Sequence, residues 1–409
     1  MEINMKKTIN ALLITILTIF SFGCKPYEMP DLSGGGSGSG SGAPIMEVPD
    51  EFILLTWTGV VDVNYAEWQL QKMVECGINT YLGWRETYNE LEVILNAADK
   101  VGINVIVSSP ELQTDTKNMV ERLTSHESFY GYHIEDEPEV SEFPILADRI
   151  NKILKYDTEH PCYVNVYPNW AWGGENGYLS KLRKFLKEVP VPFLSFDNYP
   201  IRNVNGKIEV RSDWYHNLED IRTAAKEAKM PFWSFALALS HSIPDSKYPV
   251  PTLAQLRLQQ FSNMVYGAVA FQYFTGWGYI QNGNIVQHVF DIVKQVNSEL
   301  KSMEKIFLGA NIKGVWHTGD NIPSGTKKLN ILPSGVTKLQ TSASGAIVSS
   351  FTNNGKNYMA VVNKNCEGPM ALSVGFKVDN VVTIAKGGAQ APVQENYQIE
   401  AGDILIFCW

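Results

Sequence analysis

Two short stretches of the sequence place carboxylates directly after apolar runs. GYHIEDEPEV contains Glu135, Asp136 and Glu137, and FLSFDNYP contains Asp197. Two carboxylates that face each other across a cleft can cleave a glycosidic bond, because one protonates the leaving oxygen while the other acts as base or nucleophile. Like charges held close together also raise the pKa of one member, which keeps it protonated as a general acid. The chemistry that these residues indicate is hydrolysis of a bond between sugars.

The alternation of side chains along a strand suggests which of the clustered acids act. It places Glu135 and Glu137 on one face and turns Asp136 away, unless the strand has already ended. Glu137 is best placed to reach a ligand, Asp197 is the expected second carboxylate, and Glu135 is a further candidate. The structural alternative is that Asp197 caps a loop while the three clustered acids bind a cation or a neighbouring arginine.

Aromatic and polar side chains gather after the same apolar runs. Sugar rings have apolar C–H faces that stack on aromatic rings, while amide, imidazole and guanidinium groups can bond hydroxyls. A single tryptophan could equally be a core residue, so the shared placement at one end of the runs carries the argument. The candidate substrate-binding residues are Trp57, Trp84, Arg85, Asp136, Asn169, Trp170, Asn198, Tyr199, His241, Gln272 and Trp277.

The elements that must position these residues form a regular series. Short apolar runs rich in β-branched and aromatic residues are typical of strands covered on both faces, and amphipathic helical stretches separate them. Eight such units over about 250 residues predict an α/β fold of the (β/α)8 (TIM) barrel type, whose strand C-terminal ends form the active face. The expected strands lie within 52–57, 78–84, 103–109, 129–138, 162–168, 193–200, 231–240 and 267–277.

The helical stretches carry recognisable start and stop signals. Gly77 and Gly102 are expected to end helices, and Ser141 and Asp213 to cap helix N-termini. The alternative architecture, a doubly wound open sheet, would carry a glycine-rich phosphate turn after its first strand, and LTWTGVVD lacks one. We therefore expect the barrel.

The pattern changes after about Met303. Two alternating strands flank Asn354-Gly355, a strong hairpin signal, and no long helix follows. We expect the barrel to occupy residues 45–304 and a small all-β sandwich domain to occupy 305–409.

The first 44 residues predict export. A basic start and an apolar run precede Cys24, and SFGC resembles a bacterial lipobox, in which the cysteine is lipidated. The alternative is an ordinary cleaved signal peptide with an incidental cysteine. Residues 1–24 are thus expected to be a lipoprotein signal peptide and the Gly/Ser-rich residues 25–44 a flexible tether. The expected location is the bacterial outer membrane, on its periplasmic face or at the cell surface.

Composition limits the partners. The 409-residue chain has a formal net charge of −9, which argues against nucleic acid or an anionic membrane surface as a partner. We expect contact with the membrane only through the lipid anchor. The other four cysteines lack metal-type spacing, and His133, His241 and His288 form no metal-binding motif. We expect no metal and no cofactor, and the sequence indicates no oligomeric state.

Several motifs together resemble the secreted glycoside hydrolases of clan A, especially the family 42-like (β-galactosidase-like) sequences of Bacteroidetes lipoproteins. They are GYHIEDEP at the fourth strand, FDNYP at the sixth, PFWSF at the seventh and FQYFTGW at the eighth. The resemblance is one of overall plan from about residue 50 onward. It implies that Glu137 is the acid/base and that Asp136 stands where clan A usually has asparagine.

The chain departs from that family at one catalytic position. Clan A enzymes carry a nucleophilic glutamate at the end of the seventh strand, whereas PFWSFALALSHSIPD has no carboxylate before Asp245. Either Asp197 or Glu135 supplies the second carboxylate, or the enzyme inverts, or it does not turn over. The expected function is hydrolysis of O-glycosidic bonds in a poly- or oligosaccharide. The alternative is a non-catalytic surface glycan-binding lipoprotein on a degenerate barrel.

Overall fold

The computed structural model describes residues 45–174, 177–243, 246–281 and 284–409. The predicted signal peptide, the lipidation site Cys24 and the Gly/Ser-rich tether lie outside these residues. No helix in the described part of the chain has the length and hydrophobicity needed to span a bilayer.

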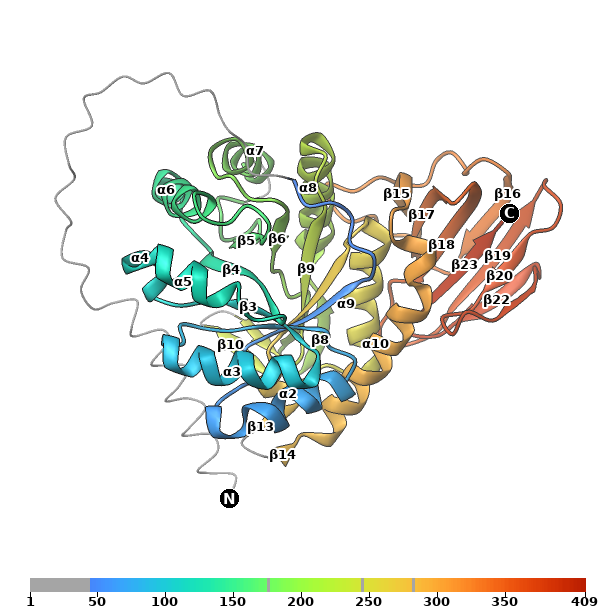
Figure 1. Cartoon of the computed structure of the whole chain (residues 1–409). Coiled ribbons are helices and arrows are strands. Elements are labelled where there is room, and N and C mark those ends of the chain that lie inside the picture. Colours follow the sequence, from blue (N-terminus) through green and yellow to red (C-terminus); the bar gives the residue numbers. More distant parts are fainter. Residues whose placement is uncertain (1–44, 175–176, 244–245, 282–283) are drawn as a thin grey trace. The chain divides into compact units, whose positions relative to one another are not determined.

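Eight parallel strands close into a barrel (Figure 1). Their order around the barrel follows the chain, and every strand falls inside one of the eight apolar runs, which confirms the TIM barrel prediction. The strands are short, and most of their residues are buried because helices cover the outside while side chains fill the inside. They are β1 (Ile53–Trp57), β2 (Thr80–Leu82), β3 (Asn104–Val107), β4 (Phe129–Asp136), β5 (Cys162–Val166), β6 (Leu194–Phe196), β9 (Phe232–Leu237) and β12 (Ala270–Phe274).

Amphipathic helices surround the barrel, each burying one apolar face. In α3, for example, Leu91, Ile94 and Leu95 are fully buried, and Gly102 ends the helix with a φ of 72°. The helices are α2 (Ala66–Glu75), α3 (Tyr88–Val101), α4 (Glu111–Thr114), α5 (Thr116–Leu123), α6 (Phe143–Leu154), α7 (Tyr178–Glu188), α8 (Ser212–Ala228), α9 (Leu253–Tyr266) and α10 (Gln287–Phe307).

Two predicted helix caps are wrong. Ser141 lies inside a short 3-10 turn, Val140–Glu142, that precedes α6, and a reciprocal pair formed by Glu139 and Glu142 caps that turn instead. Asp213 lies inside the first turn of α8, where its carboxylate pairs with Arg211 at 2.6 Å.

Two hairpins follow β6 and β9 at the C-terminal side of the barrel. The first joins β7 (Ile201–Val204) to β8 (Lys207–Val210), and the second joins β10 (His241–Ile243) to β11 (Ser246–Tyr248). A short pair, β13 (Ile280–Gln281) and β14 (Asn284–Ile285), follows β12. These insertions lengthen the loops that border the barrel mouth.

The strands after α10 form two antiparallel sheets, which confirms the predicted β sandwich. Val348, Val361 and Phe407 of the larger sheet share a core with Leu372 and Val374 of the smaller one. The larger sheet runs β15 (Asn311–His317), β17 (Ala346–Asn353), β18 (Lys356–Asn363), β23 (Ile404–Cys408), β20 (Val382–Ile384) and β21 (Gln390–Pro392); the smaller runs β16 (Val336–Thr341), β19 (Met370–Phe376) and β22 (Asn396–Ile399).

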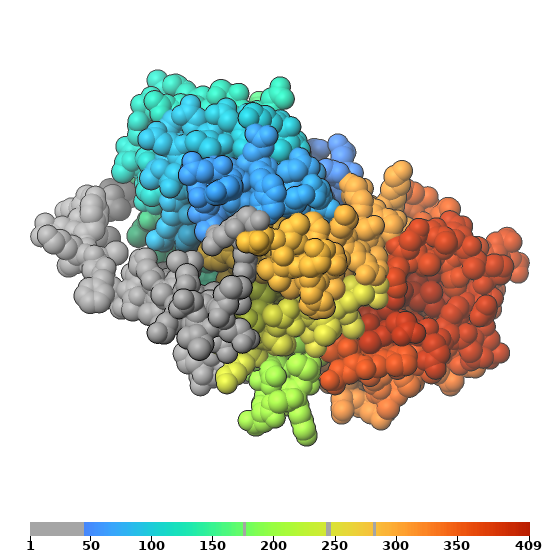
Figure 2. Space-filling view, turned by 90° about the horizontal axis from the view of Figure 1, so that it is seen from below, coloured from blue at the N-terminus to red at the C-terminus, as the bar shows by residue number. Residues whose placement is uncertain are grey.

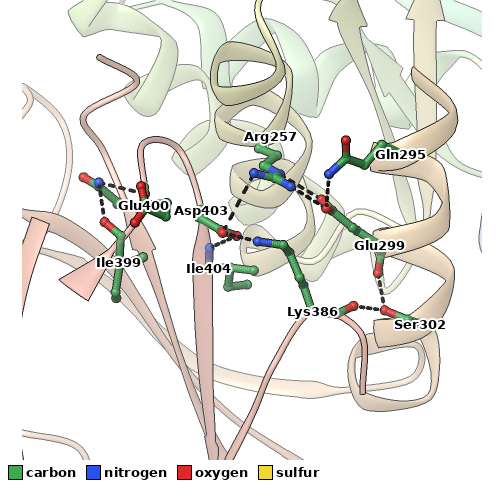
Figure 3. Close-up of polar contacts among 10 residues, drawn as sticks. Arg257, Gln295, Glu299, Ser302, Lys386, Ile399, Glu400, Asp403 and Ile404 are labelled. Atoms are coloured by element: carbon green, nitrogen blue, oxygen red, sulfur yellow. Dashed lines mark hydrogen bonds and ion pairs between the residues drawn. The ribbon is translucent and has the colours of Figure 1, made fainter. Parts of the chain in front are cut away.

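Charged side chains join α9 and α10 to the β sandwich (Figure 3). Arg257 of α9 donates to both carboxylate oxygens of Glu299 of α10, at 2.9 and 2.5 Å. Its guanidinium also lies 4.0 Å from Asp403, which pairs with Lys386. In Figure 2 the orange and red sandwich segments adjoin the amber segment of α10. A hydrophobic cluster that contains Phe307 also includes sandwich residues, so the contact has an apolar part as well.

Candidate active site

Strand β4 contains a β-bulge that decides which of its acids face the barrel interior. His133 pairs with Tyr163 of β5, but the next pair is Glu135 with Val164, so β4 carries one extra residue between the two pairs. A bulge of this kind reverses the alternation of side chains beyond it. Asp136 is therefore paired with Asn165, on the inward-facing side of the sheet.

Glu135 faces the surrounding helices and does not join the other acids. Its carboxylate accepts a hydrogen bond from Arg149 of α6 at 2.9 Å. The expectation that Glu135 and Glu137 share a face is wrong, because the bulge moves Glu135 to the outer side. One alternative for the three clustered acids was that they bind a neighbouring arginine, and Glu135 does so.

Glu137 follows the last residue of β4 in an uncommon backbone conformation. Its φ is 50°, in the left-handed region that non-glycine residues rarely occupy. Its backbone N–H donates to the carbonyl of Asn165 at 2.8 Å, which holds the residue against β5. Strained backbone of this type persists only where the surroundings fix it, and it clusters at functional sites.

A hydrogen bond joins the carboxyl groups of Glu137 and Asp197. The two residues follow β4 and β6, the strands on either side of β5. The structure thus brings together the two acids that the sequence indicated as a pair, at the C-terminal ends of their strands.

Asn165 of β5 lies between the acids and orients them. Its amide nitrogen donates to Asp197 at 2.9 Å and lies 3.2 Å from an oxygen of Asp136. Its amide oxygen lies 3.0 Å from the Ser195 hydroxyl, which belongs to a fully buried network with Tyr163 and Gln272 in the barrel interior. A rigid polar layer therefore supports the acidic cluster from below.

Burial raises the pKa of Glu137, Asp197 and Asp136, and repulsion by neighbouring carboxylates adds to the rise for Glu137 and Asp136. Burial, followed by the charges of Asp197 and Asp136, raises the pKa of Glu137 well above its ordinary value. Burial raises the pKa of Asp197 to about 6, a rise that hydrogen bonds from Asn165 and Glu137 limit. Burial and the charge of Asp197 also raise the pKa of Asp136 well above its usual range. With a pKa of about 6, Asp197 is mostly ionised at neutral pH, and the raised pKa of Glu137 favours its protonated form.

Aromatic side chains lie beside the acids, at the ends of β1 and β2. The rings of Trp57 and Trp84 are 5.3 Å apart, and both lie 5.6 Å from the imidazole of His133. Arg85, which also has a positive φ of 56°, places its guanidinium 5.0 Å from the Trp84 ring. These predicted binding residues do lie together on one side of the mouth.

Three other predicted binding residues bond groups inside the protein. Asn169 and Asn198 are buried and both bond Asn217 of α8, with which they fix the loops after β5 and β6. Gln272 belongs to the buried polar network beneath the acids. The amide groups of Asn169 and Gln272 are engaged inside the protein, which gives them a supporting role, whereas the amide oxygen of Asn198 has no partner among the described residues.

The remaining predicted residues lie on the loops at the mouth, and a hydrogen bond from Tyr199 helps to limit the raised pKa of Asp197. Tyr199 and His241 both pack against Phe274, each with ring centroids 5.7 Å apart. Trp170 is exposed, with the Arg211 guanidinium 5.0 Å from its ring. Trp277 lies in the short 3-10 helix after β12.

Asn165 and Ser195 are site residues that were not expected from the sequence. Each is a single polar residue inside an otherwise apolar strand, which is the signal that could have identified it. Among the described residues, no group of three or more His, Cys, Asp or Glu side chains is arranged to hold a metal ion. Cys76, Cys162, Cys366 and Cys408 are buried free thiols.

Comparison with solved structures finds similar structures at low sequence identity. A candidate α-galactosidase from Bacteroides fragilis matches with a TM-score of 0.50 and 10% identity, covering 87% of this chain and 79% of that one. A candidate α-L-fucosidase from Bacteroides thetaiotaomicron matches with a TM-score of 0.44 and 12% identity, over 65% of this chain and 98% of its own. An endo-1,4-β-mannanase from Rhizomucor miehei matches with a TM-score of 0.43 and 12% identity, over 64% of this chain and 99% of its own. No family model and no curated protein matches the sequence.

Proposed function

We propose that the protein is a glycoside hydrolase that cleaves O-glycosidic bonds of a poly- or oligosaccharide. The observation that carries the proposal is the proton-sharing contact between Glu137 and Asp197 at the barrel mouth. It supplies one protonated and one ionised carboxyl group at neutral pH, which is the combination that glycoside hydrolysis requires.

Each member of the pair has a distinct role. Glu137 donates its proton to the glycosidic oxygen as the bond to the leaving sugar breaks, and it later accepts a proton from water. Asp197 attacks the anomeric carbon and forms a glycosyl ester, which water then hydrolyses. Because a pair in contact is nearer to the spacing of retaining enzymes than to that of inverting ones, the product keeps the anomeric configuration of the substrate.

The surroundings of the pair support a sugar ligand. Trp84, at the end of β2, is partly exposed and packs on the buried Trp57, so its ring offers an apolar face on which the C–H face of a sugar can stack. Asn165 keeps Asp197 oriented, and Asp136 beside it can accept a hydrogen bond from a sugar hydroxyl. The named glycosidases of similar fold fit this reading, as does the resemblance to family 42-like sequences.

Placement in the cell is part of the proposal. Cys24 carries the lipid anchor, residues 25–44 form the tether, and the catalytic barrel (45–304) and the β domain (305–409) work on glycans at the outer membrane. Metabolic labelling with a fatty acid should mark the wild-type protein and leave the Cys24→Ala variant unlabelled. Equal labelling of both proteins would contradict the anchor.

The experiment that tests the function is a digest of a glycan panel. Wild-type protein should release reducing sugar from at least one glycan, whereas Glu137→Gln and Asp197→Asn should each reduce the rate by about a hundredfold or more. Equal activity in all three proteins would show that this carboxyl pair does not carry the reaction.

One observation favours a second function, non-catalytic glycan binding. Residues 237–240, at the end of β9, contain no carboxylate. In that case affinity electrophoresis would show retardation by a glycan that the protein does not degrade. Sugar release that depends on Glu137 would exclude this alternative.

A further inference from the structure

Trp170 is the most exposed tryptophan of the chain. It lies in the loop after β5 and is 43% exposed, whereas the other tryptophans are buried or half-buried. A tryptophan that packs in a core buries a large apolar area, so an exposed one forgoes a substantial gain in free energy. Single exposed apolar residues are nevertheless common on protein surfaces. The surroundings of the side chain must therefore distinguish chance exposure from a binding role.

The backbone on both sides of Trp170 is anchored. Asn169 is fully buried, its backbone N–H donates to the side chain of Asn217 at 2.8 Å, and its amide nitrogen donates to the carbonyl of Asp213 at 3.0 Å. Both partners belong to α8. Trp172, on the other side, is a buried core residue. An exposed ring on an anchored backbone loses little conformational freedom when a ligand packs on it, which favours binding.

Arg211 holds the ring of Trp170 in place. Its guanidinium lies over the ring, 5.0 Å from the centroid, and donates to both carboxylate oxygens of Asp213 at 3.0 and 2.6 Å. Tyr248 of β11 also hydrogen-bonds the Arg211 side chain. Because Arg211 is only 9% exposed, it covers the inner face of the ring, and the exposed area lies on the outer side. The ring is thus an apolar platform whose supporting charge Asp213 already neutralises.

Direct contacts connect this platform to the loop after β6, which carries Asp197. The backbone N–H of Arg211 donates to the carbonyl of Pro200, three residues after Asp197, at 2.9 Å. Tyr199, which hydrogen-bonds Asp197, packs against Tyr248 with ring centroids 6.1 Å apart. The platform therefore belongs to the same barrel mouth as the acid pair and is linked to it through Tyr199 and Tyr248.

We infer that Trp170 forms an outer subsite, on which a sugar unit of the substrate stacks beyond the units held at Glu137 and Asp197. The C–H face of a sugar packs on an aromatic ring, and a charged sugar gains no ion pair from a guanidinium that already has a carboxylate partner. The unit on Trp170 is thus a neutral sugar. The substrate is then an oligo- or polysaccharide long enough to extend from the acids to Trp170, and not a glycoside of a single sugar. The identity of the ligand as part of a substrate rests on the proposed function.

Three variants separate this role from a general effect on the fold. Trp170→Ala removes the stacking ring, whereas Trp170→Phe keeps an aromatic ring of smaller area. The matched control is Tyr156→Ala, since Tyr156 is 52% exposed and follows the C-terminal end of α6. That end lies away from the mouth, because the helices of a TIM barrel run antiparallel to its strands. All three variants change exposed side chains, so their melting temperatures should stay within about 2 °C of wild type.

The experiment measures kcat/KM on oligosaccharides of two to six units made from the glycan that the panel digest identifies. Wild-type kcat/KM should rise with chain length up to the length that reaches Trp170. On the longest oligosaccharide Trp170→Ala should lower kcat/KM about threefold to tenfold, chiefly through KM, because a contact far from the cleaved bond is equal in the bound substrate and the transition state. On the disaccharide it should stay within about twofold of wild type. Trp170→Phe should lose less than Trp170→Ala, and Tyr156→Ala should match wild type at every length.

An equal loss at every chain length in Trp170→Ala, or no loss at any length, would overturn the subsite and leave the proposed function intact. If wild type hydrolyses no glycan, the same proteins are compared by affinity electrophoresis in gels that contain the neutral polysaccharides galactomannan, xyloglucan, arabinoxylan, laminarin or galactan. Retardation of wild type and Tyr156→Ala that is lost in Trp170→Ala would uphold the subsite and contradict the proposed function instead. Equal retardation of wild type and Trp170→Ala, or no retardation of wild type, would overturn the subsite.

Discussion

At the scale of single residues, the account depends on where one proton resides. Glu137 and Asp197 share it, and the difference in their surroundings assigns it to Glu137. The Asn165 amide donates to Asp197 and favours its ionised form, whereas Glu137 is surrounded by acids that favour its protonated form. Environment rather than residue type thus distinguishes an acid from a base here.

The pH dependence of the reaction follows from these shifts. Asp197 must be ionised to act, and its raised pKa of about 6 means that kcat/KM should fall tenfold per pH unit below about pH 6. Glu137 must stay protonated, so the rate should fall again as the pH rises through its raised pKa. A pH profile of kcat/KM tests this, and a rate that is constant from pH 4 to 6 would contradict it.

As the pH rises above about 4, the free energy of unfolding should fall while kcat/KM rises. Because the folded pKa of Glu137 is raised, the carboxyl favours the folded state below its unfolded pKa, and this contribution is lost as the pH rises through the folded value. Glu137→Gln removes this loss, so its melting temperature at pH 7.5 should exceed that of wild type by about 1–3 °C. The gain should vanish near pH 4. Calorimetry at both pH values tests this, and a variant that melts below wild type at pH 7.5 would contradict it.

At the scale of elements, the bulge in β4 determines the composition of the site. It moves Glu135 outward to Arg149 and moves Asp136 inward to Asn165. Glu135→Gln should therefore keep glycan hydrolysis within about twofold of wild type, and it should change the free energy of unfolding by less than about 1 kcal/mol. Asp136→Asn serves as the matched comparison and should reduce activity severalfold. Loss of activity in Glu135→Gln alone would contradict the bulge.

The same bulge shows why the positions of the strands could be predicted from the sequence, whereas the side of the sheet on which each side chain lies could not. Strands covered on both sides consist of continuous apolar runs, so all eight could be recognised individually. A bulge is a property of the pairing between β4 and β5, which the residues of one strand do not reveal. Likewise, Asn169 and Asn198 follow strands as ligand-binding residues often do, yet their partner Asn217 lies on a helix far along the chain. The short helix α5 carries only three buried residues, a pattern too brief to recognise.

At the scale of the whole molecule, buried charges connect the barrel helices to the β sandwich. Arg257, Glu299 and Asp403 are each less than a tenth exposed. The positive charge of Arg257 lies between the negative charges of Glu299 and Asp403. Breaking such a group leaves an uncompensated buried charge, so Glu299→Ala should lower the free energy of unfolding by about 3–5 kcal/mol. The exposed pair Arg183–Glu227 is the control, and Glu227→Ala should leave stability nearly unchanged. Chemical denaturation measures both, and similar small effects would contradict the structural role of the network.

The most direct test of the central claim, that Glu137 supplies the proton to the leaving group, is the dependence of the rate on the leaving group. A glycoside that the panel digest identifies is prepared with a 2,4-dinitrophenyl leaving group, which departs without protonation, and with a methyl leaving group, which needs it. Glu137→Gln should cleave the dinitrophenyl glycoside within about tenfold of the wild-type rate while losing a factor of about 10² to 10⁴ on the methyl glycoside. Asp197→Asn should lose activity on both. Equal losses on the two substrates in Glu137→Gln, or no loss on either, would contradict the assignment.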